Sequence, residues 1–315
     1  MGCTVPKPNP VEHRATKKVY YFSGHAEEKY YITPVELPKA SNNRIIGGAP
    51  TTIEQYPFVV QIYLQRTFRC GGSLLTNTHV MSAAHCFVYS SGFYINPAAF
   101  TINIGSTHIY SEGTTHLVSA IRVHENYVSP ASDNDIAVLL LRTAVTLSST
   151  VTTAHIPVQG ASVPENATVI AVGWGTTNVN SKIPSGVLNE VAIIKINRRI
   201  CRKNFLELQA VTGITRQITN NMICAGILEV GGKDACLGDS GGPLLYGGVV
   251  VGVTSWGTGC AEAYYPGVFT KVSSYTSWIN DTINRYNGAN SLISCRVILA
   301  IPFLCFILSQ LTNFF

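Results

Sequence analysis

The chain has 315 residues, of which 46% are hydrophobic and 12% charged, so it can build one large core or two modest ones. This composition excludes disorder for most of the chain. Its 22 Lys and Arg outnumber its 17 Asp and Glu, but within 45–287 the balance is 14 to 13. The basic surplus therefore lies mainly before residue 45, and no basic stripe points to nucleic acid as a partner.

Residues 1–44 are predicted to form a leader, because Pro and charge are scattered through 1–18 and the longest apolar run is only Val19 to Phe22. A secretory signal needs a contiguous apolar stretch of about seven residues or more, and none is visible. Six of the nine cysteines lie among glycine-rich turns between Cys70 and Cys260, which favours disulfides and an oxidising compartment. The two observations conflict, so we expect the true start of the protein to differ from the one given.

From Ile45 onward, short β-favouring runs alternate with Gly, Pro, Asn and Ser, which indicates an all-β barrel or sandwich long enough for two barrels. The runs are Phe58 to Leu64, Phe100 to Ile104, Ile136 to Leu141, Ala167 to Val172, Val191 to Ile196, Val249 to Val253 and Val268 to Val272.

One helix is predicted, near 273–286, where apolar side chains recur at spacings of three and four residues. Its apolar face comprises Tyr275, Trp278, Ile279, Ile283 and Tyr286. Because it follows the last strand, we expect it on the outside of a barrel.

The C-terminal tail, residues 288–315, contains an apolar stretch from Val297 to Leu308 that is interrupted by Pro302. A spanning helix needs about 20 apolar residues and usually a basic flank. The small residues 287–289 upstream also fit a cleaved lipid-anchor signal. The sequence leaves open a lipid-anchor signal, a membrane span or an uninformative extension.

Three short segments carry the residue types of nucleophilic catalysis: Ser82 to Cys86, Asp133 to Ala137 and Gly238 to Pro243. They place His, Asp and Ser in the chain order of chymotrypsin, which differs from that of subtilisins and α/β-hydrolases. Further motifs in register are Ile45 to Gly48, Cys70 to Leu74, Gly173 to Gly175 and Ser255 to Gly257.

With these motifs the chain resembles the chymotrypsin-like serine peptidase family over residues 45–286, about three quarters of its length, and in outline the three-disulfide digestive trypsins of insects. The resemblance implies an all-β fold of two six-stranded antiparallel β-barrels with a C-terminal helix. It also implies a catalytic domain at 45–287, with the active site in the cleft between the barrels.

A serine hydroxyl is a poor nucleophile at neutral pH, so peptide cleavage needs a base within reach and a third group that fixes the tautomer of the base. We expect Ser240 to be the nucleophile, His85 the base and Asp135 its orienting group. A lone His or Asp is more often a core, surface or turn residue, but Ser240 stands in a glycine-rich turn where its hydroxyl can project. The competing candidates, which lack matching sequence contexts, are His79, Asp133 and Ser73.

The resemblance assigns the backbone N–H groups of Gly238 and Ser240 to the oxyanion hole. Asp239, beside the nucleophile, is expected to be desolvated and to need a partner. The Arg44–Ile45 bond looks like an activation site, because cleavage there frees an α-amino group with a pKa of about 8 that can pair with Asp239. Alternatively, Gly238 is an ordinary turn glycine and Arg44 an exposed linker residue.

Asp234, six residues before Ser240, resembles the floor of the trypsin specificity pocket. A buried carboxylate there favours Arg or Lys, because an apolar side chain would leave the charge unpaired. The other expected substrate-binding residues are Ser255, Trp256, Gly257 and Gly267. Asp234 could instead be a solvated loop residue paired with Lys233. Departures from the family pattern at Leu237 and Phe269 leave the fine subsite preference open.

By the same resemblance, the cysteines pair as Cys70 with Cys86, Cys201 with Cys224, and Cys236 with Cys260, although spacing alone allows fifteen connectivities. The cysteines left without a role are Cys3, Cys295 and Cys305. No metal or cofactor is predicted, since the loop from Gly105 to His116 holds one acidic residue where calcium needs several oxygen ligands. Asn166 and Asn280 begin glycosylation triplets.

The implied function is a trypsin-like serine endopeptidase, made as a zymogen, that cleaves after Arg or Lys through an acyl-enzyme. Its expected partners are protein or peptide substrates, a protease that cleaves after Arg44 and protein protease inhibitors. We expect an extracellular monomer, attached to a membrane only if the tail is an anchor. The alternatives are a chymotrypsin-like preference and a non-catalytic homologue that serves as a binding module.

Overall fold

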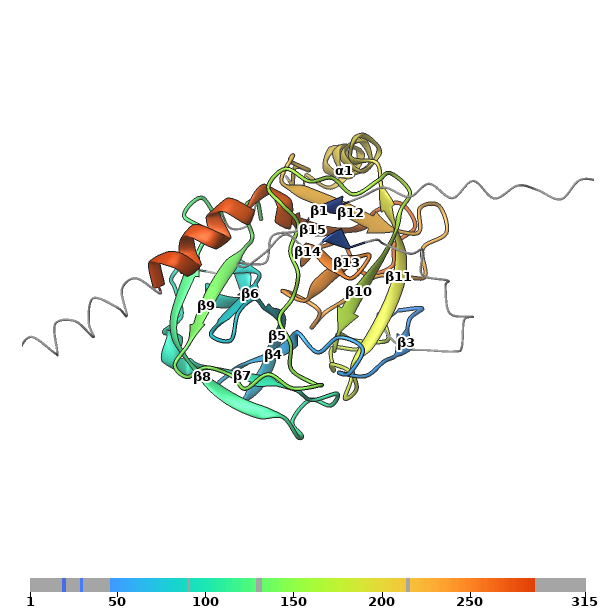
Figure 1. Cartoon of the computed structure of the whole chain (residues 1–315). Helices are drawn as coiled ribbons and strands as arrows, with labels where there is room; N and C mark the ends of the chain where they lie inside the picture. Colours follow the sequence, from blue (N-terminus) through green and yellow to red (C-terminus); the bar gives the residue numbers. More distant parts are fainter. Residues whose placement is uncertain are drawn as a thin grey trace, which may run out of the picture.

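A computed structural model describes residues 19–20, 29–30, 46–89, 91–128, 132–213 and 216–286 (Figure 1). Strands β1 (Val19–Tyr20) and β2 (Lys29–Tyr30) pair antiparallel. Arg44, Ile45 and the whole C-terminal tail lie outside these residues. The three interpretations of the tail therefore stay predictions. Within the described ranges, no helix is long and apolar enough to cross a membrane.

The first barrel closes in the strand order β4-β5-β6-β9-β8-β7. Its strands are β4 (Val59–Leu64), β5 (Thr67–Leu74), β6 (His79–Ser82), β7 (Phe100–Ile104), β8 (Thr114–Val123) and β9 (Ala137–Leu141). Every second residue of a strand faces inward, so Val60 and Ile62 of β4 and Ile102 and Ile104 of β7 fill the interior with at most 1% exposure. The barrel closes because β4 pairs with β5 on one side and with β7 on the other.

The second barrel runs β10-β13-β14-β15-β12-β11, and β11 pairs back onto β10. Its strands are β10 (Thr168–Gly173), β11 (Asn189–Ile196), β12 (Met222–Gly226), β13 (Pro243–Tyr246), β14 (Val249–Trp256) and β15 (Gly267–Lys271), and β3 (Ala49–Pro50) adds to β11. The two closed six-stranded antiparallel barrels confirm the predicted fold class.

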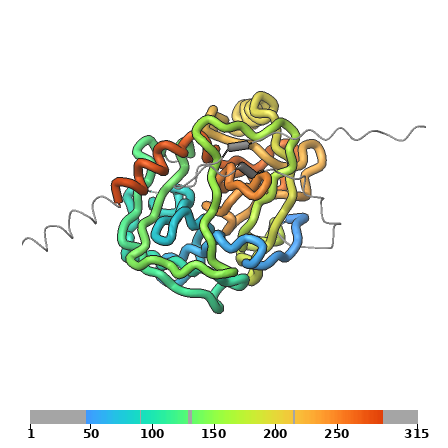
Figure 2. Tube along the Cα trace, in the orientation of Figure 1, coloured from blue at the N-terminus to red at the C-terminus, as the bar shows by residue number. Residues whose placement is uncertain are grey.

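The segment 142–167 connects the barrels and can be followed as the yellow-green tube that crosses between them in Figure 2. Its Thr152 N–H donates to Pro57 O at the start of the first barrel, and its His155 carbonyl accepts from Val250 N of β14. The connection thus bonds to both barrels and helps to fix the junction at which the site lies.

The helix expected near 273–286 is present as a 3-10 turn, η3 (Val272–Ser274), followed by an α-helix over 276–286. Tyr275 and Ile279 are buried in the core cluster that includes the first barrel, and Trp278 Nε1 donates to Glu125 Oε2 at 3.0 Å. The helix therefore follows the last strand of the second barrel and covers the outside of the first, where Figure 1 shows it in red beside the green strands.

A second helix, α1 (Arg198–Thr212), corrects the prediction of a single helix. The Asn197 side chain accepts from Arg199 N at its start, and Gly213 ends it with a left-handed φ of 71°. Only Cys201 and Phe205 of this helix are buried, one turn apart. Most residues of this helix are polar or charged, so it lacks the dense apolar face of the C-terminal helix, and its sequence did not stand out as helical.

Candidate active site

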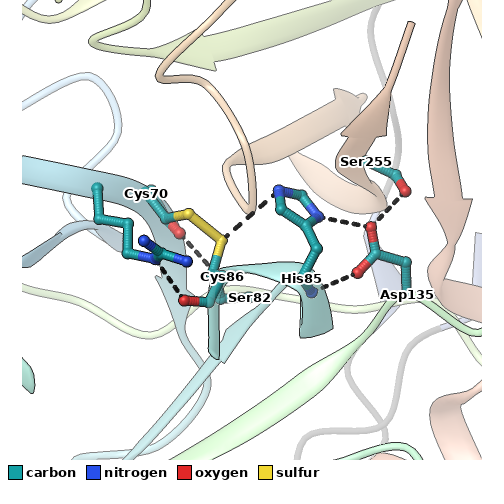
Figure 3. Close-up of a disulfide and its surroundings, with 8 residues drawn as sticks. Cys70, Ser82, His85, Cys86, Asp135 and Ser255 are labelled. Atoms are coloured by element: carbon teal, nitrogen blue, oxygen red, sulfur yellow. Dashed lines mark hydrogen bonds and ion pairs between the residues drawn. A yellow bond between two sulfur atoms is a disulfide. The ribbon is translucent and has the colours of Figure 1, made fainter. Parts of the chain in front are cut away.

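A histidine–aspartate pair lies at the junction of the barrels (Figure 3). His85 lies in a 3-10 turn, η1 (Ala84–Phe87), which begins two residues after the end of β6, and Asp135 lies two residues before the start of β9. His85 N donates to Asp135 Oδ1 at 2.9 Å, and Nδ1 lies 2.8 Å from Oδ2. An ionised carboxylate can only accept, so Nδ1 carries the proton and Nε2 is the basic nitrogen.

Asp135 is completely buried, and hydroxyl groups of the second barrel satisfy its polar atoms. Ser255 Oγ of β14 donates to Oδ2 at 2.5 Å, and Thr270 Oγ1 of β15 donates to the Asp135 backbone carbonyl at 2.8 Å. Both barrels therefore hold the carboxylate in place. Sequence reasoning assigned Ser255 to substrate binding, and it missed this contact and Thr270 altogether.

The surroundings of His85 shift its basicity. Burial of the ring opposes protonation, but the charge and hydrogen bond of Asp135 outweigh it and hold the pKa of His85 above its ordinary value. The positive charges of Arg69 and Arg216 act in the opposite direction. The ring is thus a base of raised strength whose side chain remains 31% exposed.

Ser240 lies in a turn that requires glycine on both sides, because Gly238 and Gly241 have φ of 99° and 78°. Gly71 N of β5 donates to Ser240 O at 2.8 Å, and a Cβ at Gly241 would collide with Ser82 Oγ at the end of β6. The turn is therefore packed against the strand ends that lead into η1, which brings Ser240 and His85 to the same part of the junction.

Among the residues that the structure describes, no hydrogen bond joins Ser240 to His85, whose Nε2 lies 3.9 Å from Cys86 Sγ. Such bonds are often long in unliganded sites. The competing candidates have other surroundings: His79 Nδ1 bonds to Thr76 Oγ1 at 2.8 Å, Asp133 accepts from Thr219, and Ser73 is buried inside β5.

Asp239, in the loop before β13, is buried with 2% exposure and accepts from Gly175 N at 2.7 Å and Cys236 N at 2.9 Å. No cationic side chain in the described ranges lies within 4.0 Å of it. Burial raises the pKa of Asp239 to about 6, and the two backbone bonds only partly oppose this rise. The expected partner, Ile45, lies outside the described residues.

Residues 46 and 47, which follow Ile45 directly, are described, and they contact residues 232 and 234. Ile46 O accepts from Asp234 N at 3.3 Å, and a Cβ at Gly47 would collide with Gly232 O. The segment directly after Ile45 is therefore packed against the segment that carries Asp234.

Asp234 is buried, with 3% exposure, and is not the solvated loop residue of the alternative interpretation. Its Oδ2 accepts from Ala261 N at 3.1 Å, whereas its Oδ1 has no hydrogen-bond partner among the described residues. A Cβ at Gly267 would lie 2.5 Å from that Oδ1, so only glycine leaves room beside the carboxylate. Burial, with a contribution from Asp239, raises the pKa of Asp234 to about 7.

The three disulfides are present in the structure with the pairing that the resemblance implied: Cys70–Cys86, Cys201–Cys224 and Cys236–Cys260. Sulfur atoms of Cys70 and Cys86 lie close enough to His85 to suggest a metal site, but both are bonded to each other and cannot act as thiolate ligands. Asn166 and Asn280 are exposed, and their glycosylation stays a prediction.

The sequence model of the trypsin family matches residues 45–279. The chain is 39% identical to "Trypsin, alkaline B" of Manduca sexta over 247 residues, which cover 77% of this chain and 92% of that protein. It is 40% identical to "Trypsin" of Phaedon cochleariae over 76% of this chain and 88% of that protein. It is also 40% identical to "Trypsin Blo t 3" of Blomia tropicalis, over 75% of this chain and 84% of that protein.

The double barrel, together with these similarities, defines the class as serine endopeptidases, which are hydrolases. The chain belongs to the trypsin family. The resemblance drawn from the sequence motifs is thereby confirmed.

Proposed function

We propose that the protein cleaves peptide bonds after Arg or Lys, with Ser240, His85 and Asp135 as its catalytic residues. Ser240 Oγ attacks the scissile carbonyl carbon while His85 Nε2 accepts its proton. The backbone N–H groups of Gly238 and Ser240 stabilise the resulting oxyanion. His85 then returns the proton to the leaving amine, and water hydrolyses the acyl-enzyme by the same steps in reverse order.

The observation that carries the specificity is the Oδ1 of Asp234, which is buried beside Gly267 and has no hydrogen-bond partner in the described part of the chain. A buried carboxylate without a full set of hydrogen bonds is costly, so a cationic side chain that enters beside it gains a charge-assisted bond. An apolar side chain would leave the carboxylate unpaired, which disfavours the chymotrypsin-like alternative.

Replacing Asp234 by Ser tests this specificity. For an Arg ester we expect kcat/KM to fall by about 10²- to 10³-fold, because the substrate cation loses its buried partner. For a Phe ester we expect no loss, since no buried charge remains to be left unpaired. Steady-state kinetics with both esters measure the change, and Asp281→Ser, which removes an exposed carboxylate, is the matched control. Equal losses for both esters would contradict the assignment of Asp234.

We further propose that residues 1–44 form a propeptide and that cleavage of the Arg44–Ile45 bond activates the domain at 45–287. Asp239 is buried without a cation among the described residues, and residues 46 and 47 already lie beside the Asp234 segment. A new ammonium at Ile45 would neutralise Asp239 and order the adjacent Gly238 turn.

Arg44→Gln is expected to block activation, because an activating protease specific for basic residues no longer finds its site. The intact chain should show activity about 10²- to 10³-fold below that of the cleaved protein, as expected when the oxyanion donors are not in place. N-terminal sequencing with an Arg amide assay measures both properties, and Lys39→Gln controls for charge loss in the leader. Full activity from an intact Arg44→Gln chain would overturn the proposal.

Three disulfides within a single catalytic unit favour an oxidising environment, so we propose that the protein acts outside the cell, as a monomer, on protein or peptide substrates. Protein protease inhibitors would compete for the same site. Digestion is the physiological role that the similarity to trypsins favours.

A further inference from the structure

Arg216, in the segment after α1, lies over the ring of Trp256, which the sequence analysis assigned to substrate binding. Its guanidinium carbon lies 5.2 Å from the centroid of the Trp256 ring, which is within the range of a cation–π contact. The same indole makes an edge-on contact with Phe205 of α1, with ring centroids 5.0 Å apart. Trp256 therefore has a packed aromatic neighbour and carries Arg216, so both side chains are held in place.

The charge of Arg216 has no ion-pair partner among the residues that the structure describes. In the described ranges, the only ion pairs are His85–Asp135, Lys195–Glu165 and Lys203–Glu207. Arg69, the other cation whose charge reaches His85, differs because its Nε already donates to Cys86 O at 2.6 Å. Arg216 is thus a half-buried guanidinium whose charge reaches His85 and is balanced by no carboxylate in the described part of the chain.

The position of Trp256 relates Arg216 to the substrate. Trp256 directly follows Ser255, which bonds to Asp135, and it pairs with Val268, the neighbour of Gly267 beside the Asp234 carboxylate. If a cationic side chain occupies the Asp234 pocket, as proposed above, we expect the substrate residues that precede it to lie near the Ser255–Trp256 end of β14, which borders that pocket. The Arg216 cation over Trp256 would then be close to those residues.

We propose that Arg216 and Trp256 form a subsite for an acidic side chain located two to four residues before the cleaved bond. This inference rests on the proposed function. The guanidinium carbon lies over the indole ring, and no ion pair among the described residues involves Arg216, so its N–H groups can bind a carboxylate with two hydrogen bonds. The preferred substrate then carries Asp or Glu shortly before the Arg or Lys at which it is cleaved.

The test uses the full, activated protein and matched peptides with Arg before the cleaved bond and Glu, Gln or Lys at the second, third or fourth preceding position. At one of these positions we expect kcat/KM for Glu to exceed that for Gln by about three- to fivefold, mainly through KM, as for a partly exposed ion pair. The preference should diminish when about 0.5 M salt is added.

Variants assign this preference to a residue. Arg216→Gln should bring the ratio of kcat/KM for the Glu peptide to that for the Gln peptide to about one, and Arg216→Glu should favour the Lys peptide. Arg202→Gln, which removes an exposed cation from α1, should keep the wild-type ratio.

Equal cleavage of all three peptides by the wild-type protein would overturn this inference alone, and so would a preference that survives in Arg216→Gln. If the wild-type protein cleaves none of the peptides after Arg, the proposed function fails together with the subsite.

Discussion

Replacing Ser240 by Ala is expected to lower kcat for an Arg amide by about 10⁶-fold while leaving KM nearly unchanged. The loss is large because the alanine side chain has no atom that can attack the carbonyl, and the binding pocket at Asp234 is untouched. Stopped assays with long incubation measure the residual rate. Ser277→Ala, which removes an exposed hydroxyl from the C-terminal helix, should retain full activity.

A Ser240→Ala protein that keeps substantial turnover would remove the proposed mechanism. It would imply either that another residue is the nucleophile or that water attacks the peptide bond directly. The alternative of a non-catalytic homologue makes a different prediction, since it expects no activity in the unmodified protein after cleavage at Arg44.

Asp135→Asn is expected to lower kcat by about 10⁴-fold, because the amide no longer fixes the histidine tautomer with a proton on Nδ1. It should also change the pH dependence. His85 must be neutral to act as a base, so activity falls as the pH drops through its pKa, which Asp135 now holds above the ordinary histidine value. Without the carboxylate the pKa falls, and the acidic limb of the residual activity should move to lower pH.

Profiles of kcat/KM over about pH 5 to 9 measure this shift. Asp133→Asn, two residues away and bonded to Thr219, is the matched control and should keep the wild-type profile within a few fold in rate. An unchanged acidic limb in Asp135→Asn would mean that another group governs the basicity of the site.

The regular strands of the fold could be predicted from sequence where β-branched runs are long and uniformly buried. The run at Phe100 to Ile104 matches β7 residue for residue, and Val268 to Val272 differs from β15 by one residue at each end. Strand β8 was missed because it is largely exposed, with only Val118 and Val123 buried. Strand β5 was missed because Cys70, Gly71 and Gly72 interrupt its apolar pattern.

Some features of the candidate site could likewise be predicted from the sequence, and others could not. Residues in short motifs, such as Ser240 within its glycine-rich turn, could be found from the sequence because their function depends on local backbone geometry. The contacts of Ser255 and Thr270 with Asp135 span 120 and 135 residues of chain, and no local pattern encodes them. The position of Arg216 over Trp256 likewise depends on the unpredicted helix α1 and the segment that follows it.

The most direct test of the account is to treat the protein with an Arg-containing phosphonate that reacts with activated serines, before and after cleavage at Arg44, and to map the adduct by mass spectrometry. The account predicts one adduct on Ser240 in the cleaved protein, with parallel loss of activity, and little or none in the intact chain. An adduct on another residue, or an active cleaved protein that the reagent leaves unmodified, would contradict it.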